Sequence, residues 1–140
     1  MPKKPEPRLA HSLRKLREQI DALFANRSKL SDGWIGDLAH SNRTSDHNPD
    51  PEGVVHAIDI THDPDNGFDA EAFAERMRTV KDRRLKYLIF NKRIFSATVH
   101  GWEWRKYAGS NTHEKHVHIS VTARHGDDGS EWRLTEKRHV

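Results

Sequence analysis

The sequence predicts an α+β fold, with a small antiparallel sheet and flanking helices. Three observations favour this fold class: a helix-like apolar stripe near the N-terminus, a second helical stretch in the middle, and short apolar runs with strand-like alternation. The chain has 140 residues, of which 32% are charged and 34% hydrophobic, so we expect one domain with a modest core. We place that domain at 8–123, between a disordered N-terminus at 1–7 and a charged C-terminal tail at 124–140.

Two segments carry helical periodicity. In the first, 8–25, apolar residues recur at steps of three and four, as on the buried face of a helix: Leu9, Leu13, Leu16, Ile20 and Leu23. The second helix is expected over 68–82, with Asp69 as its N-cap. The intervening segment 26–53 is rich in Ser, Asp, Asn, Gly and Pro and predicts a long irregular loop, which in so small a domain usually carries function.

Four apolar runs predict strands: 54–60, 85–90, 93–99 and 116–122. The middle two flank Asn91-Lys92 and should form a hairpin, although they lack the favoured Asn-Gly pair. Side chains alternate along a strand, so the last strand should have one apolar face that packs into the core. Its other face would carry polar side chains: His116, His118 and Ser120.

The composition excludes several classes of protein. Without cysteine, the chain can form neither disulfides nor thiolate metal sites, so any metal must be held by His, Asp or Glu. The sequence contains no run of about 18 apolar residues, so we expect no membrane span. The N-terminal segment has lysines but no apolar signal-peptide core, so we expect synthesis in the cytoplasm. The net charge of +3 mildly favours an anionic partner such as nucleic acid or a bacterial cell wall.

Histidines are the strongest compositional clue. The chain has 11, and three of them fall within HEKHVHIS at 113–120. Imidazole suits metal binding and proton transfer near neutral pH. An aspartate also lies inside the apolar run AIDI, where an unpaired carboxylate would be costly to bury. A loop histidine, this strand aspartate and a histidine on another strand form a candidate three-ligand set of the kind that holds catalytic zinc: His47, Asp59 and His118.

Two motifs resemble those of the LAS zinc peptidases, which include D-Ala-D-Ala carboxypeptidases, L-alanyl-D-glutamate endolysins and murein endopeptidases. SDHNP followed by GVVHAID resembles their Ser-x-His…Gly-x-Ala-x-Asp signature, and HEKHVH resembles the His-x-x-His-x-His of the murein endopeptidase branch. The resemblance covers roughly 30–122. It departs from the family pattern in three places: Asp59 follows His47 after a longer gap, Val55 replaces a glycine, and Lys115 replaces a glutamate that many members use as base.

The resemblance implies a hedgehog/D-Ala-D-Ala peptidase-like fold and one zinc ion per chain. The implied zinc ligands are His47, Asp59 and His118. His116 would be the catalytic histidine that polarises or deprotonates water, unless Glu114 is the base. His113 would be a supporting histidine near the leaving group.

The remaining candidate residues would contact substrate. By the same resemblance, Arg43 would bind the substrate carbonyl or carboxylate, and Ser45 would brace the loop or the substrate. Apart from the resemblance, the aromatic residues of the run GWEWRKY belong either to the core or to the cleft wall, and in the cleft wall Trp104 would stack on the substrate.

The expected function is a zinc-dependent peptidase that hydrolyses peptide bonds in bacterial peptidoglycan, as an endolysin, a murein endopeptidase or a carboxypeptidase would. Its partner would be a peptidoglycan stem peptide, with no nucleic acid, and we expect a monomer that acts on the cell wall after release or export. The sequence leaves the cleaved bond open among L-Ala–D-Glu, D-Ala–D-Ala and D-Ala–diaminopimelate.

Two alternatives stay open. The HVH run also occurs in HUH endonucleases, which are metal-dependent nickases of single-stranded DNA with a tyrosine nucleophile; the candidates here are Tyr87 and Tyr107. The other alternative is a non-catalytic, zinc-stabilised module that binds the cell wall. A closed site with His116 or His113 as a fourth ligand would favour that module.

Overall fold

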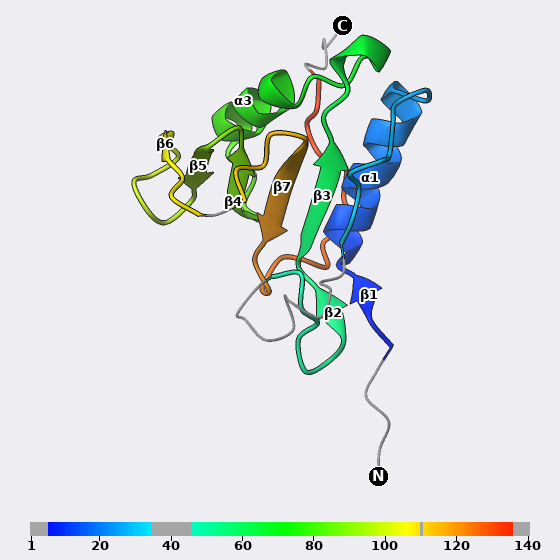
Figure 1. Ribbon diagram of the computed structural model, residues 1–140. Coiled ribbons are helices and arrows are strands. Elements are labelled where there is room, and N and C mark those ends of the chain that lie inside the picture. The colour runs from blue at the N-terminus through cyan, green and yellow to red at the C-terminus, as the bar shows by residue number, and fades with distance from the viewer. Residues whose placement is uncertain (1–5, 35–45, 110, 136–140) are drawn as a thin grey trace, which may run out of the picture.

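The computed structural model describes residues 6–34, 46–109 and 111–135, which form an α+β fold as the sequence predicts. Two α-helices accompany a five-stranded antiparallel sheet and a small parallel strand pair in this part of the chain (Figure 1). The helices are α1 (His11–Leu23) and α3 (Ala70–Val80), with the 3-10 helix η1 (Pro64–Asn66) between them. The strands are β1 (Arg8–Leu9), β2 (Val54–Val55), β3 (Ala57–Thr61), β4 (Leu85–Phe90), β5 (Arg93–Ser96), β6 (Arg105–Lys106) and β7 (His116–Val121).

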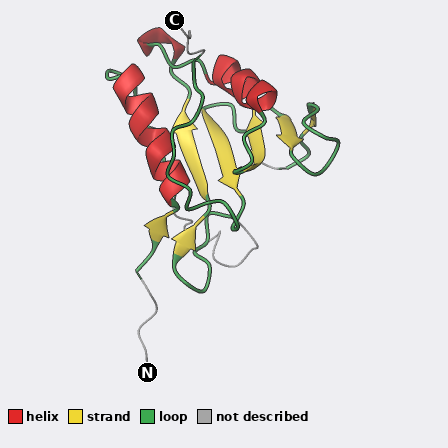
Figure 2. Cartoon of the chain, turned by 180° about the vertical axis from the view of Figure 1, so that it is seen from behind, coloured by secondary structure: helices red, strands yellow, loops and turns green. Residues whose placement is uncertain are grey.

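The order of the sheet is β3-β7-β4-β5-β6, which places β7 between β3 and β4 (Figure 2). The register sets Asp59 of β3 opposite His118 of β7, and Tyr87 of β4 opposite Ser120. Because side chains alternate, the apolar residues of β7 pack into the core while its histidines lie on the other face. The expected division of the last strand into two faces is therefore confirmed.

Helix α1 begins at His11 rather than at the expected residue 8. Arg8 and Leu9 form β1, which pairs in parallel with β2, and the Arg8 amide donates to the Gly53 carbonyl at 2.8 Å. The predicted apolar stripe is nevertheless buried from Leu13 to Ile20. A pairing with a segment so distant in sequence overrides the helical periodicity of the first residues.

Helix α3 matches its prediction closely. The Asp69 carboxylate accepts hydrogen bonds from the amides of Glu71 and Ala72, as an N-cap should. The helix ends at Val80 and is followed by the C-cap residue Lys81, whose φ of 56° is left-handed. Phe73 and Met77 are buried on one face of the helix.

The expected hairpin forms between β4 and β5. Asn91 and Lys92 make its two-residue turn, with positive φ angles of 50° and 66°. Positive φ at both central positions is typical of a type I′ turn, which matches the twist of the strands it joins. The strand predicted at 93–99 is shorter than expected, since β5 ends at Ser96. The run predicted at 54–60 forms two strands, β2 and β3, with a break at His56.

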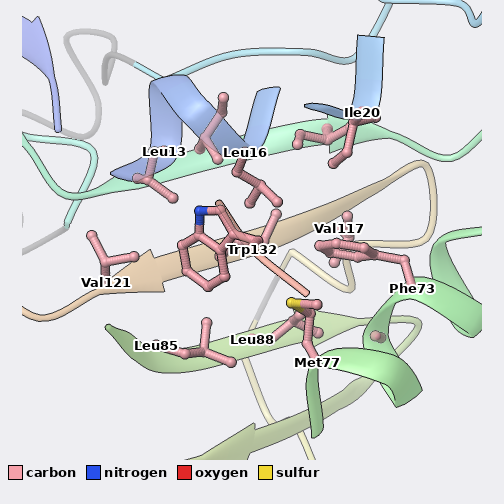
Figure 3. Packing of buried hydrophobic residues seen from close by; sticks show 14 of the residues in the cluster. Leu13, Leu16, Ile20, Phe73, Met77, Leu85, Leu88, Val117, Val121 and Trp132 are labelled. Carbon is pink, nitrogen blue, oxygen red and sulfur yellow. The ribbon is translucent and has the colours of Figure 1, made fainter. Parts of the chain in front are cut away.

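The core lies between the helices and the apolar face of the sheet (Figure 3). Trp132 is in the middle of it, 2% exposed, and its indole N–H donates to the Ser12 carbonyl at 2.8 Å. The Arg84 guanidinium lies 4.0 Å from the centre of the indole ring. The described part of the segment that we assigned to a charged tail thus contributes a large side chain to the core.

Parts of both expected tails, 1–5 and 136–140, lie outside the described residues. Within the residues that are described, neither helix has the length and apolar character needed to cross a membrane.

Candidate metal centre

Three segments that are far apart in sequence bring His47, Asp59 and His118 together. The Nδ1 atom of His118 lies 3.0 Å from Asp59 Oδ1, and the Nε2 atom of His47 lies 3.3 Å from Asp59 Oδ2. One donor atom from each of the three residues lies within 4.8 Å of the other two. Both histidines are buried, at 7% and 5% exposure. The residues that the sequence nominates as ligands could therefore hold a metal ion.

The second nitrogen of each of these two imidazoles has its own partner. Gly33 pairs with Asp59 across an isolated bridge, and the following residue, Trp34, places its carbonyl 3.0 Å from His47 Nδ1. His118 Nε2 lies 2.8 Å from the Ser120 hydroxyl.

These partners are compatible with metal-binding tautomers. With an ion bound, a proton on His47 Nδ1 and on His118 Nε2 would satisfy both outer contacts, and the nitrogen that faces Asp59 would bind the ion. Without an ion, a proton on that nitrogen is donated to the Asp59 carboxylate. Metal-ligating histidines commonly have outer partners of this kind, which fix ring orientation and tautomer. Two imidazoles and one carboxylate are donors that divalent metal ions accept.

Charge at the cluster favours a cation. Burial alone would raise the pKa of Asp59, but hydrogen bonds and charge from His118 and His47 hold it below its usual range. Burial lowers the pKa of His47, yet the contact with Asp59 outweighs burial and leaves that pKa raised. The carboxylate is thus ionised, and a divalent cation can provide the positive charge that the protonated histidine otherwise supplies.

His113 and His116 complete the histidine cluster. His116 Nε2 lies 3.5 Å from Asp59 Oδ2. The rings of His113 and His116 meet edge to face, with their centroids 5.1 Å apart. Burial lowers the pKa of His116 and lowers that of His113 to about 4. Both imidazoles are therefore neutral at pH 7 and can accept a proton or bind a metal.

The two tyrosines named for the nickase alternative both contact this cluster. Tyr87 stacks on His118 with an interplanar angle of 10°, and Tyr107 meets His113 edge-on at 5.7 Å between centroids. Burial raises the pKa of Tyr87 to about 12, and its hydroxyl hydrogen-bonds with Ser120. The position of Tyr87 follows from the pairing of β4 with β7, a register that local sequence does not specify.

Two candidates lie elsewhere. The indole N–H of Trp104 donates to Glu75 of α3 at 2.9 Å, and its ring meets the buried Phe95 edge-on. Trp104 therefore packs against the core on the helix-covered face, away from the histidines, so of its two expected places the core is correct and the substrate-binding role in the cleft wall is wrong. Glu114 is exposed and accepts a hydrogen bond from Thr112, so of the two candidates for the base, His116 is the one that lies beside Asp59.

Arg43 and Ser45, the expected substrate-contacting residues, lie outside the described residues. No family model matches the chain, and no curated protein and no solved structure matches it either. The likeness to the LAS peptidases is thus a resemblance of motifs, and a functional proposal depends on these motifs and on the geometry of the cluster.

Proposed function

We propose that this chain is a zinc-dependent peptidase with a hedgehog/D-Ala-D-Ala peptidase-like fold that hydrolyses peptide bonds in bacterial peptidoglycan. One observation carries the proposal: His47, Asp59 and His118 converge around one carboxylate with the outer nitrogen of each ring already anchored. The motif resemblance supplies the substrate class, and the absence of cysteine is compatible with a zinc site of nitrogen and oxygen donors.

The proposed zinc ligands are His47 Nε2, the Asp59 carboxylate and His118 Nδ1. Zinc held in this way supplies a Lewis acid for the scissile carbonyl and lowers the pKa of water. With three protein ligands, a site of this type keeps a position open for chemistry. The Asp59 carboxylate would compensate part of the charge of the ion, and the burial of both imidazoles would limit the access of bulk water to it.

His116 is the proposed general base. Its ring is neutral at pH 7 because burial lowers its pKa, and its Nε2 atom has no hydrogen-bond partner among the described residues. Nε2 can take a proton from the attacking water and return it to the departing amine. His113, packed edge-on against this ring, supports its orientation close to the leaving group.

Arg43 and Ser45 enter the proposal through the resemblance alone. Arg43 would bind the substrate carbonyl or carboxylate, and Ser45 would brace the loop that carries His47. A guanidinium is suited to this role because its planar donors match a carboxylate in a bidentate way.

A single-stranded DNA nickase of the HUH type is the second candidate. It is favoured by one observation, that Tyr87 and Tyr107 lie against His118 and His113. A nickase needs an accessible tyrosine with a nucleophilic oxygen, however, and burial raises the pKa of Tyr87 to about 12. The peptidase therefore remains the better supported function.

Turnover with two substrates separates these functions. Purified protein is incubated with peptidoglycan sacculi or with single-stranded DNA, each with and without a zinc chelator. We expect new amino termini from sacculi, lost with chelator, and no DNA nicking. Chelator-sensitive nicking that disappears in Tyr87→Phe or Tyr107→Phe would favour the nickase, and binding to sacculi without turnover would favour the wall-binding module.

Substitution of the proposed base gives a second comparison. His116→Ala should abolish release of amino termini while the protein keeps its zinc. The matched control His100→Asn removes an exposed imidazole with a φ of 55°, a conformation that asparagine tolerates, and should keep full activity. Full activity in His116→Ala would contradict its assigned role.

A further inference from the structure

A second set of donors shares Asp59 with the proposed zinc ligands. One donor atom each from Asp59, His113 and His116 lies within 4.8 Å of the other two, as in the first set. The two sets have only the carboxylate in common. Asp59 Oδ1 faces His118, whereas Oδ2 faces both His47 and His116, at 3.3 and 3.5 Å.

The nitrogens of the second set are buried and lack hydrogen bonds. His113 is only 7% exposed, and its Nδ1 atom has no hydrogen-bond partner among the described residues. His116 Nε2 is likewise buried without a hydrogen bond. A buried polar atom without a partner is destabilising unless a ligand satisfies it, so two such atoms on neighbouring imidazoles beside one carboxylate indicate a binding site.

The backbone holds His113 in this place. Its φ of 55° lies in the left-handed region, which few residues other than glycine adopt. Its amide donates to the side chain of Asn111, and its carbonyl accepts from the amide of Asn91 in the β4–β5 turn. A strained residue that is fixed on both sides, with its ring among other histidines, is typical of a functional site.

We propose that Asp59, His113 and His116 form a second divalent-metal site, bridged to the first by the carboxylate of Asp59. Two imidazoles and a carboxylate favour a borderline ion such as Zn²⁺ or Co²⁺. One carboxylate serves two dications in this arrangement, so the second ion binds more weakly than the first.

The second site has a consequence that rests on the proposed function. An ion on His116 Nε2 occupies the lone pair that the proposed base needs, so the second ion inhibits hydrolysis. Zinc then activates the peptidase at low concentration and inhibits it at high concentration, because the second ion and the proton of the attacking water compete for His116 Nε2.

Metal titration tests the binding site without any substrate. Metal-free full-length protein is titrated with ZnCl₂ in a calorimeter, with circular dichroism as a check on folding. We expect one tight and one weaker event for the unsubstituted protein. His113→Asn, which suits the left-handed backbone, should lose only the weaker event, and His116→Ala should do the same.

The controls identify which site is lost. His47→Ala should lose the tight event, and His100→Asn should keep both. A single event in the unsubstituted protein overturns the proposal, as does a second event that survives in folded His113→Asn and His116→Ala. Loss of the only tight event in His116→Ala also overturns it, because His116 would then be a fourth ligand of a closed site.

Hydrolysis of sacculi distinguishes the proposed peptidase function from the proposed second metal site. With sacculi as substrate, each rate is expressed relative to the rate of the same protein at one zinc per chain, since His113→Asn should have a lower basal rate. The unsubstituted protein should lose activity above the second zinc dissociation constant, and His113→Asn should need at least tenfold more zinc for the same fractional loss. If no sacculi are cleaved, the proposed function fails while the titration still decides on the second site. Cleavage with equal zinc inhibition in both proteins would contradict the assigned mechanism of inhibition.

Discussion

At the scale of single residues, the orientation of the His118 ring depends on Ser120, two positions further along the same strand. The Ser120 hydroxyl lies 2.8 Å from His118 Nε2, and it also hydrogen-bonds with the Tyr87 hydroxyl. Tyr87 in turn stacks flat on the His118 ring. These contacts fix the orientation of the imidazole, so Nδ1 already faces Asp59 at 3.0 Å before any ion arrives.

Ser120→Ala should therefore weaken zinc binding while leaving all three proposed ligands in place. Loss of an outer partner of this kind typically costs about 10–100-fold in metal affinity. Competition with a chromophoric chelator measures the change. Ser130→Ala serves as the control and should bind zinc normally, because its hydroxyl donates to Asp128 and accepts from Arg84, neither of which belongs to the histidine cluster. An unchanged affinity in Ser120→Ala would show that Ser120 has no part in positioning His118.

A second residue-scale feature is the buried Arg27, which is 5% exposed and pairs with Asp32 through two hydrogen bonds of 3.0 and 2.8 Å. Burial would raise the pKa of Asp32, but Arg27 and the amide and hydroxyl of Thr61 hold it below its usual value. The pair thus ties the segment after α1 to β3, which carries Asp59.

Because folding lowers the pKa of Asp32, its stabilising contribution is complete above its unfolded-state pKa of about 3.9 and is lost as the pH falls through the folded-state pKa. Asp32→Asn should lower the free energy of unfolding by about 1–3 kcal/mol at pH 7, and the difference should shrink toward pH 2. Urea denaturation at both pH values measures it. Asp65→Asn, at an exposed position in η1, should change stability little, and a pH-independent deficit in Asp32→Asn would exclude this linkage.

At the scale of elements, most of the helices, strands and turns are specified by local sequence. The Asp69 cap and the alternation of β7 depend on neighbouring residues, and both are confirmed. The predicted start of α1 at residue 8 was wrong, because β1 pairs with β2 and the Arg8 amide bonds to Gly53. No local sequence pattern reveals a pairing between segments so far apart. The hairpin was predicted from two apolar runs, although its turn lacks glycine.

That turn provides a prediction. Lys92 has a φ of 66°, which a lysine adopts at a cost of about 1 kcal/mol, so Lys92→Gly should stabilise the protein modestly, by about 0.5–1 kcal/mol. Thermal unfolding followed by circular dichroism measures the shift. Lys92→Ala removes the same side chain without relieving the strain and should give no such gain. A lower melting temperature in Lys92→Gly would contradict the type I′ assignment.

At the scale of the whole molecule, the candidate site exists because the sheet brings three distant segments together. The approach of His118 to Asp59 was predictable in part, since strand alternation places each on a polar face. The contacts of Tyr87 and Trp34 were not predictable, because they depend on strand order and on a bridge from Gly33 to Asp59. Trp104 was misplaced for the same reason, since only the fold decides which face of the sheet it covers.

The core has the same dependence on tertiary structure. Trp132 lies in a segment that composition marks as a charged tail, yet it packs among the apolar residues of α1, α3 and the sheet (Figure 3). A single tryptophan in a polar segment gives little local signal for this. Because the core covers the apolar face of the sheet, the histidines of β7 lie on its opposite face.

The zinc content of the purified protein is the measurement that tests the central claim most directly. After dialysis against metal-free buffer, the unsubstituted protein and His100→Asn should each retain one zinc ion per chain, measured by elemental analysis against protein concentration. Folded His47→Ala, Asp59→Ala and His118→Ala should each retain none. Retention of a full zinc ion by any of these three variants, or no zinc in the unsubstituted protein, would contradict the metal centre described here.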